Sequence, residues 1–188
     1  MRRAVLFLLL MLSWPAAAQS DATKQSDVWA SARADGVVIL MRHAIAPGTG
    51  DPAGFTLGDC STQRNLNDQG RTQARRIGAA IRAADIKIDL VLTSAWCRAA
   101  ETTELLGLGT VTVEPALNSF FDGRADSDRA TAELRARLKT LNGRKAVLVT
   151  HQVNITALTG VYPASGEMIF IAIEPVGEVS VRGRLALP

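Results

Sequence analysis

Short runs of apolar residues recur along the chain, each with the length expected of one β-strand. The first, Val37–Met41, has five apolar residues in succession, which is typical of a strand buried on both faces of a parallel sheet. The same pattern predicts further strands over residues 88–94, 110–118 and 146–150. The tail, residues 167–187, predicts two more strands joined by a turn at Pro175-Val176-Gly177.

Between these runs, apolar residues recur at helical spacing. Asn67 is a typical N-cap residue, and the stretch after it places apolar residues on one face at Ala74, Ile77, Ile81 and Ala84. A short helix is predicted over residues 95–107, closed by Gly107, and an amphipathic one over residues 126–143. Alternating strands and helices predict an α/β fold: a three-layer α/β/α domain with a mostly parallel central sheet.

Two segments show neither period. Residues 19–34 are polar and small, and we expect a loose entry segment there. Residues 45–70 are rich in Gly, Pro, Asp and Asn, and a loop of this length inside a compact domain is often functional. No internal repeat or second domain is evident, so residues 19–188 are predicted to form a single domain.

The first 18 residues have the layout of a secretory signal peptide. Arg2 and Arg3 precede the apolar run Ala4–Leu12, and three alanines end the segment at Ala18. A retained membrane anchor is the alternative, but the apolar run is short for a bilayer span. We therefore expect cleavage after Ala18, export to the periplasm, and no membrane span in the mature chain.

Composition and charge narrow the classes of function. The 188 residues are 47% hydrophobic, which suits a globular domain with a substantial core. Loss of residues 1–18 removes two arginines and no acidic residue, which lowers the net charge from +3 to +1. No run of lysines and arginines with interleaved aromatics is present, so no nucleic-acid partner is expected.

The chain has two cysteines and two histidines. In an oxidising compartment Cys60 and Cys97 can form a disulfide, which we favour, although two free buried thiols remain the alternative because sequence does not give their separation. Two cysteines and two histidines without a ligand spacing do not indicate a metal site. We expect neither a metal nor a cofactor.

Both histidines directly follow a predicted buried strand. His43 comes after the first strand, next to Arg42, and His151 comes after the strand at residues 146–150. Arg98 follows closely on a third strand. One such placement could be an ordinary solvated strand end. However, the carboxyl ends of parallel strands share one edge of a sheet, so these side chains are expected to converge in one pocket.

Two arginines beside two histidines suit phosphate chemistry. A phosphate group carries close to two negative charges near neutral pH, and guanidinium groups match its oxygens with paired, charge-assisted hydrogen bonds. A neutral imidazole can attack phosphorus, which divides hydrolysis into two steps through a phosphohistidine. The pattern therefore predicts phosphoryl transfer.

The segments "LMRHA", "LTSAWCRAAETTELL" and "VLVTHQVNI" resemble, in this order, the signature motifs of the histidine phosphatase superfamily, the phosphoglycerate-mutase-like group. The resemblance covers roughly residues 36–160. It implies a metal-independent enzyme with His43 as nucleophile, Arg42 and Arg98 as phosphate clamps, and His151 as a second phosphate-contacting residue.

The chain departs from the family at the proton donor. Many members carry Leu-x-Glu after the third strand, where this chain reads "ALNSF" and has Ser119. Asp122 could supply the proton if apolar neighbours raise its pKa, and a plain turn aspartate is the alternative. Thr49, in the loop after His43, and Arg64 are further candidates for contact with the substrate.

These observations predict an exported, metal-independent phosphomonoesterase. Its substrate would be a phosphorylated small molecule or a sugar of the envelope lipopolysaccharide. Two alternatives stay open: a protein phosphohistidine phosphatase, and a non-catalytic module that binds phosphate or a phosphosugar.

Overall fold

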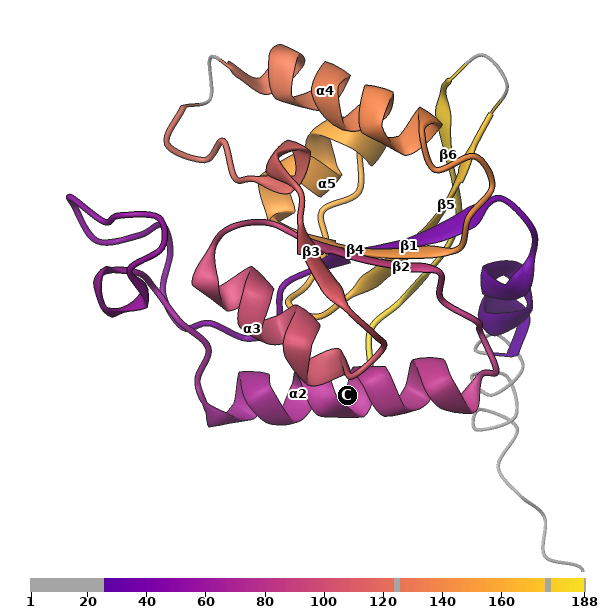
Figure 1. Ribbon diagram of the computed structural model, residues 1–188, viewed down its shortest axis with the longest axis horizontal. Coiled ribbons are helices and arrows are strands. Elements are labelled where there is room, and N and C mark those ends of the chain that lie inside the picture. The colour runs from indigo at the N-terminus through magenta and orange to yellow at the C-terminus, as the bar shows by residue number, and fades with distance from the viewer. Residues whose placement is uncertain (1–25, 124–125, 175–176, 188) are drawn as a thin grey trace, which may run out of the picture.

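The protein forms three layers, with a central sheet between helices on its two faces (Figure 1). The computed structural model describes residues 26–123, 126–174 and 177–187. Within them six strands form one mixed sheet in the order β3-β2-β4-β1-β5-β6. The prediction of an α/β fold with a mostly parallel central sheet is confirmed. The predicted signal peptide, residues 1–18, lies outside the described residues, and so do residues 175 and 176 of the predicted turn.

The two parts of the sheet differ in strand direction. The strands of the parallel part are β1 (Val37–Arg42), β2 (Leu90–Thr93), β3 (Val111–Val113) and β4 (Ala146–Thr150). β5 (Met168–Ile173) and β6 (Val179–Leu185) are added antiparallel at the side of β1. β1 therefore lies between β4 and β5, buried within the sheet.

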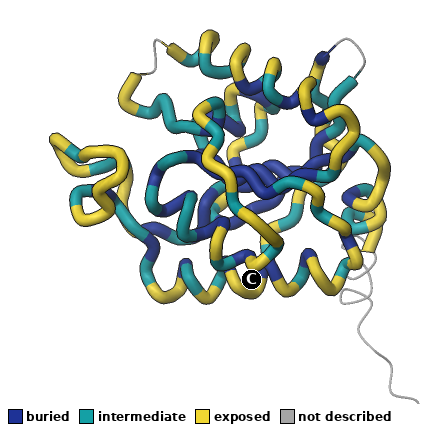
Figure 2. The backbone as a smooth tube through the Cα atoms, in the orientation of Figure 1, coloured by how far each residue is buried: buried dark blue, intermediate teal, exposed yellow. Residues whose placement is uncertain are grey.

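The alternation of side chains along β1 provides both faces of the core. Met41 contributes to a buried cluster with Ile77 of helix α2 (Asp68–Ala83), on the face that α2 shares with α3 (Cys97–Leu106). Leu40 contributes to a second cluster with Leu138 of α4 (Ser127–Lys139), on the face that α4 shares with α5 (Gln152–Thr159). Figure 2 shows the buried strands at the centre and the exposed residues on the outer sides of the helices.

The prediction of a loose entry segment is wrong for residues 26–33, which form a helix. Its residues Val28, Trp29 and Ala32 pack against the core, and the Trp29 ring lies 5.8 Å from that of Phe170, centroid to centroid. These three apolar side chains lie on one face of the helix and pack it against the core. The polar residues around them made the helical periodicity hard to recognise in the sequence. Residues 19–25 lie outside the described residues.

The third strand is shorter than predicted. Only Val111–Val113 pairs with β2, and Pro115–Leu117 forms a 3₁₀ helix. Pro115 has no N–H for a strand ladder, and the Glu114 side chain accepts a hydrogen bond from the backbone N–H of Ala116, which stabilises the turn instead.

The predicted disulfide is present in the structure. Cys60 and Cys97 are bonded, with their Cα atoms 5.7 Å apart. Cys60 belongs to a 3₁₀ helix, Cys60–Thr62, in the long loop after β1, and Cys97 is the first residue of α3. The bond therefore fastens that loop to the helix that carries Arg98.

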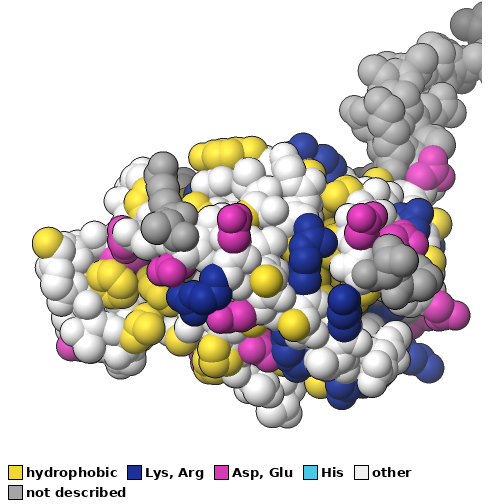
Figure 3. All heavy atoms as spheres, turned by 90° about the horizontal axis from the view of Figure 1, so that it is seen from above, with side chains coloured by type: hydrophobic (Ala, Val, Ile, Leu, Met, Phe, Trp, Pro, Cys, Tyr) yellow, Lys and Arg dark blue, Asp and Glu magenta, His cyan; other side chains and the backbone are white. Residues whose placement is uncertain are grey.

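The outer surface of the α4 layer carries mixed charge. Figure 3 shows lysines and arginines interspersed with aspartates and glutamates on this face. Arg129 of α4, for example, pairs with Asp126 and Glu133. Within residues 26–123, 126–174 and 177–187, every helix is too short or too polar to span a bilayer.

Helices α2 and α3 approach closely at Gly78. A Cβ atom built on Gly78 would lie 1.9 Å from the backbone oxygen of Leu106, which is far inside contact distance. The neighbouring atoms are backbone, so they have little freedom to move aside. Only glycine fits this position of α2.

We predict that Gly78→Ala destabilises the protein, although alanine normally stabilises a helix interior relative to glycine by about 0.5–1 kcal/mol. Overpacking against a backbone should outweigh that gain and cost about 1–3 kcal/mol or more. Urea or thermal unfolding measures the difference. Arg75→Ala, at an exposed site of the same helix, serves as the control and should change stability by less than about 0.5 kcal/mol. Equal or greater stability in Gly78→Ala would contradict the close packing.

Candidate active site

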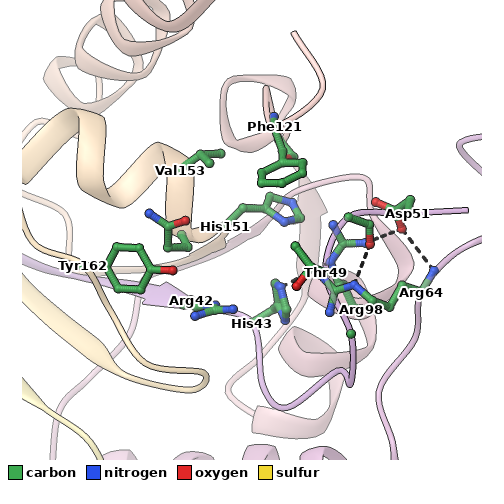
Figure 4. A pocket seen from close by; sticks show the side chains of 14 residues that line it. Arg42, His43, Thr49, Asp51, Arg64, Arg98, Phe121, His151, Val153 and Tyr162 are labelled. Carbon is green, nitrogen blue, oxygen red and sulfur yellow. Dashed lines mark hydrogen bonds and ion pairs between the residues drawn. The ribbon is translucent and has the colours of Figure 1, made fainter. Parts of the chain in front are cut away.

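The carboxyl ends of β1, β2 and β4 meet at one edge of the sheet. Arg42 pairs in register with Thr150, and Thr93 pairs with Val149, so the residues that follow these strands are neighbours in space. They line a pocket of about 120 Å³, which Figure 4 shows from close by. This volume is small beside the roughly 300–1,000 Å³ of sites for drug-sized ligands, and it suits one compact polar group.

His43 is held in one orientation at the base of the pocket. Its backbone N–H donates to the oxygen of Thr150 (3.0 Å), and its own oxygen accepts from the N–H of Gly166 (3.1 Å). In the ring, Nδ1 lies 2.8 Å from the oxygen of Ala44, and Nε2 accepts from Nε of Arg98 at 3.2 Å. These partners assign the proton to Nδ1 and the lone pair to Nε2.

The surroundings keep His43 neutral. Burial, and next the positive charge of Arg98, lower the pKa of His43 to about 3. The residue as a whole is 2% exposed. At neutral pH the ring therefore presents an uncharged Nε2 lone pair, which is the form a nucleophile requires.

His151 lies beside His43 at the start of α5. The centroids of the two imidazole rings are 5.5 Å apart. The Trp96 ring also packs against His151, with 5.3 Å between the ring centroids. Nε2 of His151 is 2.8 Å from Oγ of Ser94, while Nδ1 is buried without a hydrogen-bond partner among the described residues. Burial, and next the proximity of His43, lower the pKa of His151 well below its ordinary value. Unpaired buried polar atoms are rare, so this nitrogen is available for a hydrogen bond to a bound molecule.

Three guanidinium groups line the same pocket. Arg98 reaches it from the first turn of α3, Arg42 from the end of β1, and Arg64 from the long loop. Nη1 of Arg42 donates to the oxygen of Pro163 (3.0 Å), and Nε of Arg64 donates to the oxygen of Gly50 (2.7 Å). Burial, and next the charge of Arg98, lower the pKa of Arg64 to about 10. All three remain cations at neutral pH.

The predicted site residues divide into two groups by position. The pocket is lined by six of them: Arg42, His43, Thr49, Arg64, Arg98 and His151. Asp122 is exposed and is not among the lining residues, although its charge is near enough to favour the cationic form of Arg98. The apolar surroundings envisaged for Asp122 are therefore not those of the structure. The catalytic and binding roles of all seven residues stay predictions.

Sequence reasoning missed several polar residues of the site, among them Ser94 and Asp51. Ser94, the first residue after β2, holds His151 through a hydrogen bond between Oγ and Nε2, and its place directly after a strand could have drawn attention to it. Asp51 lines the pocket from the long loop and accepts a hydrogen bond from Arg98. Burial raises the pKa of Asp51, but the hydrogen bonds from Arg98 and its neighbours outweigh this, and the net pKa is lowered.

The pocket is rich in cations and poor in metal ligands. Asp51 is the one carboxylate among the lining residues of the described chain. Across the described residues, no three of the His, Cys, Asp and Glu side chains lie together in a way that could hold a metal ion. The arrangement is one that can bind a multiply charged anion.

Comparison with protein families gives a match over part of the chain. Residues 38–126 match the model of the histidine phosphatase superfamily (branch 1). A search of curated proteins returned no significant match.

Several solved structures share the fold. The protein histidine phosphatase SixA, complexed with tungstate, is 20% identical over 80% of this chain and 96% of its own, with a TM-score of 0.58. Phosphoserine phosphatase from Entamoeba histolytica, in complex with 3-phosphoglyceric acid, is 14% identical over 80% and 97%, with a TM-score of 0.60. A mycobacterial glucosyl-3-phosphoglycerate phosphatase is 16% identical over 79% and 98%, with a TM-score of 0.54. At these identities the likeness concerns the fold.

The depressed pKa of His43 predicts a pH dependence of stability. An unfolded chain protonates this histidine near pH 6.5, whereas the folded protein does so only near pH 3, so folding stability falls as the pH falls through this window. His43→Gln removes the contribution, and its melting temperature should fall less between about pH 7 and pH 5 than that of the parent. Identical pH slopes in parent and variant would show that folded His43 titrates like an exposed histidine.

Proposed function

We propose that this protein hydrolyses phosphate monoesters through a phosphohistidine formed on His43, and the match of residues 38–126 to the model of the histidine phosphatase superfamily (branch 1) supports the proposal. One observation carries the proposal. The neutral Nε2 of His43 opens onto a pocket that three arginines and a second histidine line. A phosphate dianion suits this charge, and its phosphorus then lies next to the nucleophile.

In the first step, Nε2 attacks phosphorus and the bond from phosphorus to the leaving oxygen breaks. Arg98 transfers its Nε hydrogen bond from His43 to a phosphate oxygen, which frees the attacking lone pair. Arg42, Arg64 and Arg98 stabilise the charge on the transferred group in the transition state. The oxygen of Ala44 accepts from Nδ1 and so stabilises the positive charge that develops on the imidazole.

In the second step, water attacks the phosphohistidine. The bond from phosphorus to Nε2 breaks, and His43 returns to its neutral form. One proton of the water stays on the released hydrogen phosphate, and the other replaces the proton given to the leaving group. His151 lies beside the transferred group, and its unpaired Nδ1 is suited to a hydrogen bond with that group.

The proton donor for the leaving group is a separate proposal. Ser119 lines the pocket in place of the family's glutamate, and Asp122 lies three residues further on in an exposed turn. Asp122 could donate directly or through water to a substrate that fills the pocket mouth. Substrates with good leaving groups would need no dedicated acid.

The mouth of the pocket favours a neutral leaving group. Its side chains are uncharged: Ser119, Phe121, Gln152, Val153 and Tyr162. Tyr162 is 69% exposed, but hydrogen bonds fix the residues that follow it. The backbone oxygen of Pro163 accepts from Arg42, and the N–H of Ala164 donates to the Glu167 carboxylate. Figure 4 shows Tyr162 on the side of the pocket opposite Asp51. A phosphorylated small molecule such as a sugar, including one of the envelope, fits this rim.

A protein phosphohistidine is the second candidate substrate. Its P–N bond has a good leaving group, so hydrolysis does not require a buried acid, and the lining residues of the described chain offer none besides the ion-paired Asp51. Export to the periplasm, which the leader sequence predicts, favours the small molecule instead. A module that only binds phosphate is the third candidate, and a turnover assay distinguishes it.

His43→Ala is predicted to abolish turnover of phosphate esters, because no other group in the proposed mechanism supplies the nucleophile. In the parent, a rapid quench that avoids acid should trap phosphate on His43, and peptide mapping by mass spectrometry should locate it. EDTA in the same assay should leave the rate of the parent unchanged. Full activity in His43→Ala, or loss with EDTA that a divalent ion restores, would require a different mechanism.

Tyr162→Ala is predicted to raise KM for a sugar phosphate about fivefold, consistent with the loss of one aromatic contact, and to leave methyl phosphate kinetics unchanged. Tyr162→Phe keeps the ring and should resemble the parent. Val113→Ala, at an exposed apolar site on β3, controls for surface effects. Equal changes for both substrates would remove Tyr162 from substrate recognition.

A further inference from the structure

We infer that Asp51 is the positioning residue of the phosphate site: it fixes the guanidinium of Arg98 against the nucleophile and sets the charge of the pocket. The inference rests on the proposed function, because it assumes that phosphate binds beside His43. It concerns a residue in the long loop after β1 that the reaction steps above do not use.

Asp51 and Arg98 form a buried ion pair. Oδ1 of Asp51 lies 2.7 Å from Nη1 of Arg98, and their side chains are 3% and 4% exposed. Two further donors reach the same carboxylate: the backbone N–H of Arg64 bonds Oδ1 and Nε1 of Trp96 bonds Oδ2, each at 3.1 Å. Both oxygens are therefore fixed, and Asp51 presents one defined acceptor to Arg98.

The ion pair determines how Arg98 faces the nucleophile. Asp51 binds Nη1, and Nε donates to Nε2 of His43. Neither contact uses Nη2. Since a guanidinium group is planar and rigid, fixing two of its nitrogens also fixes the direction of the third. The edge formed by Nε and Nη2 is thus held toward a phosphate that reaches His43.

Asp51 also balances the charge of the pocket. Arg42, Arg64 and Arg98 contribute three positive charges, and Asp51 contributes the one carboxylate among the lining residues of the described chain. The resulting charge of +2 is equal and opposite to the charge of a phosphate monoester dianion. Without the carboxylate, three cations would repel one another in a poorly hydrated site. Arg98 would also lose the acceptor that fixes its Nη1.

A positioning role fits the electrostatics of Asp51 better than a role as an acid. Hydrogen bonds from Arg98 and its neighbours outweigh the effect of burial and lower the pKa of Asp51, so the carboxylate is ionised at neutral pH and carries no proton to donate. Its loop is also fastened to α3 by the Cys60–Cys97 disulfide and by a hydrogen bond from the N–H of Cys97 to Gln63. The carboxylate and the guanidinium are thus held on segments that are tied together.

A double-mutant cycle of Asp51→Ala and Arg98→Ala tests the inference. If Asp51 acts through Arg98, Asp51→Ala should lower kcat/KM at least about tenfold in the parent, the loss expected for one charged hydrogen bond, but less than about twofold in the Arg98→Ala background. Asp51→Asn, whose amide oxygen can still accept from Arg98, should lie between the parent and Asp51→Ala. Equal losses in both backgrounds would show that Asp51 acts independently of Arg98 and would overturn the inference.

The same cycle measured by tungstate binding, with isothermal titration calorimetry, needs no turnover. A parent that neither hydrolyses phosphate esters nor binds tungstate would refute the proposed function. A parent that binds tungstate, with additive effects of the two substitutions, would refute only the role of Asp51. Glu104→Ala, an exposed carboxylate of α3, controls for a general change in charge, and circular dichroism checks that every variant is folded.

Discussion

The parallel pairing of β1, β2 and β4 is the constraint on which the rest of the site depends. In this register Arg42, the last residue of β1, lies opposite Thr150, the last residue of β4, and a histidine follows each strand directly. A shift of either strand by one residue would turn its side chains to the opposite face. The apolar residues of β1, which contact helices on both sides of the sheet, oppose such a shift. The core therefore determines the geometry of the chemistry as well as the stability of the fold.

Burial creates an electrostatic problem at this edge of the sheet, and the residues present solve it in two ways. The two histidines avoid the cost of a buried charge by staying neutral, with lowered pKa values. The arginines cannot lose their protons, so they require partners: backbone oxygens for Arg42 and Arg64, and a carboxylate for Arg98. The site is thus prepared for an anion without being left with three unbalanced cations.

Much of this arrangement could be predicted from the sequence, because it follows from local periodicity. The strand runs, the amphipathic helices and the position of a histidine directly after a strand are all visible in windows of about ten residues. Asp51 was not predictable in this way, because its partners Arg98 and Trp96 belong to a distant helix start, and only the folding of an irregular loop brings them together. Asp122 shows the reverse: its neighbours in sequence are aromatic, yet the turn leaves it exposed. The helix over residues 26–33 was missed because its few apolar positions acquire meaning only against the finished core.

The order of strands in the sheet has a consequence for how the protein is made. β1 hydrogen-bonds only to β4 and β5 in the described structure, and Ile39 pairs with Val147 and Phe170, both more than a hundred residues further along the chain. During synthesis this apolar strand therefore emerges long before either of its partners exists. Contacts of such large sequence separation form slowly, and an unpaired apolar strand is prone to aggregation. Both strands that flank β1 come from the C-terminal part of the chain, so the native sheet is complete only when nearly the whole chain is available.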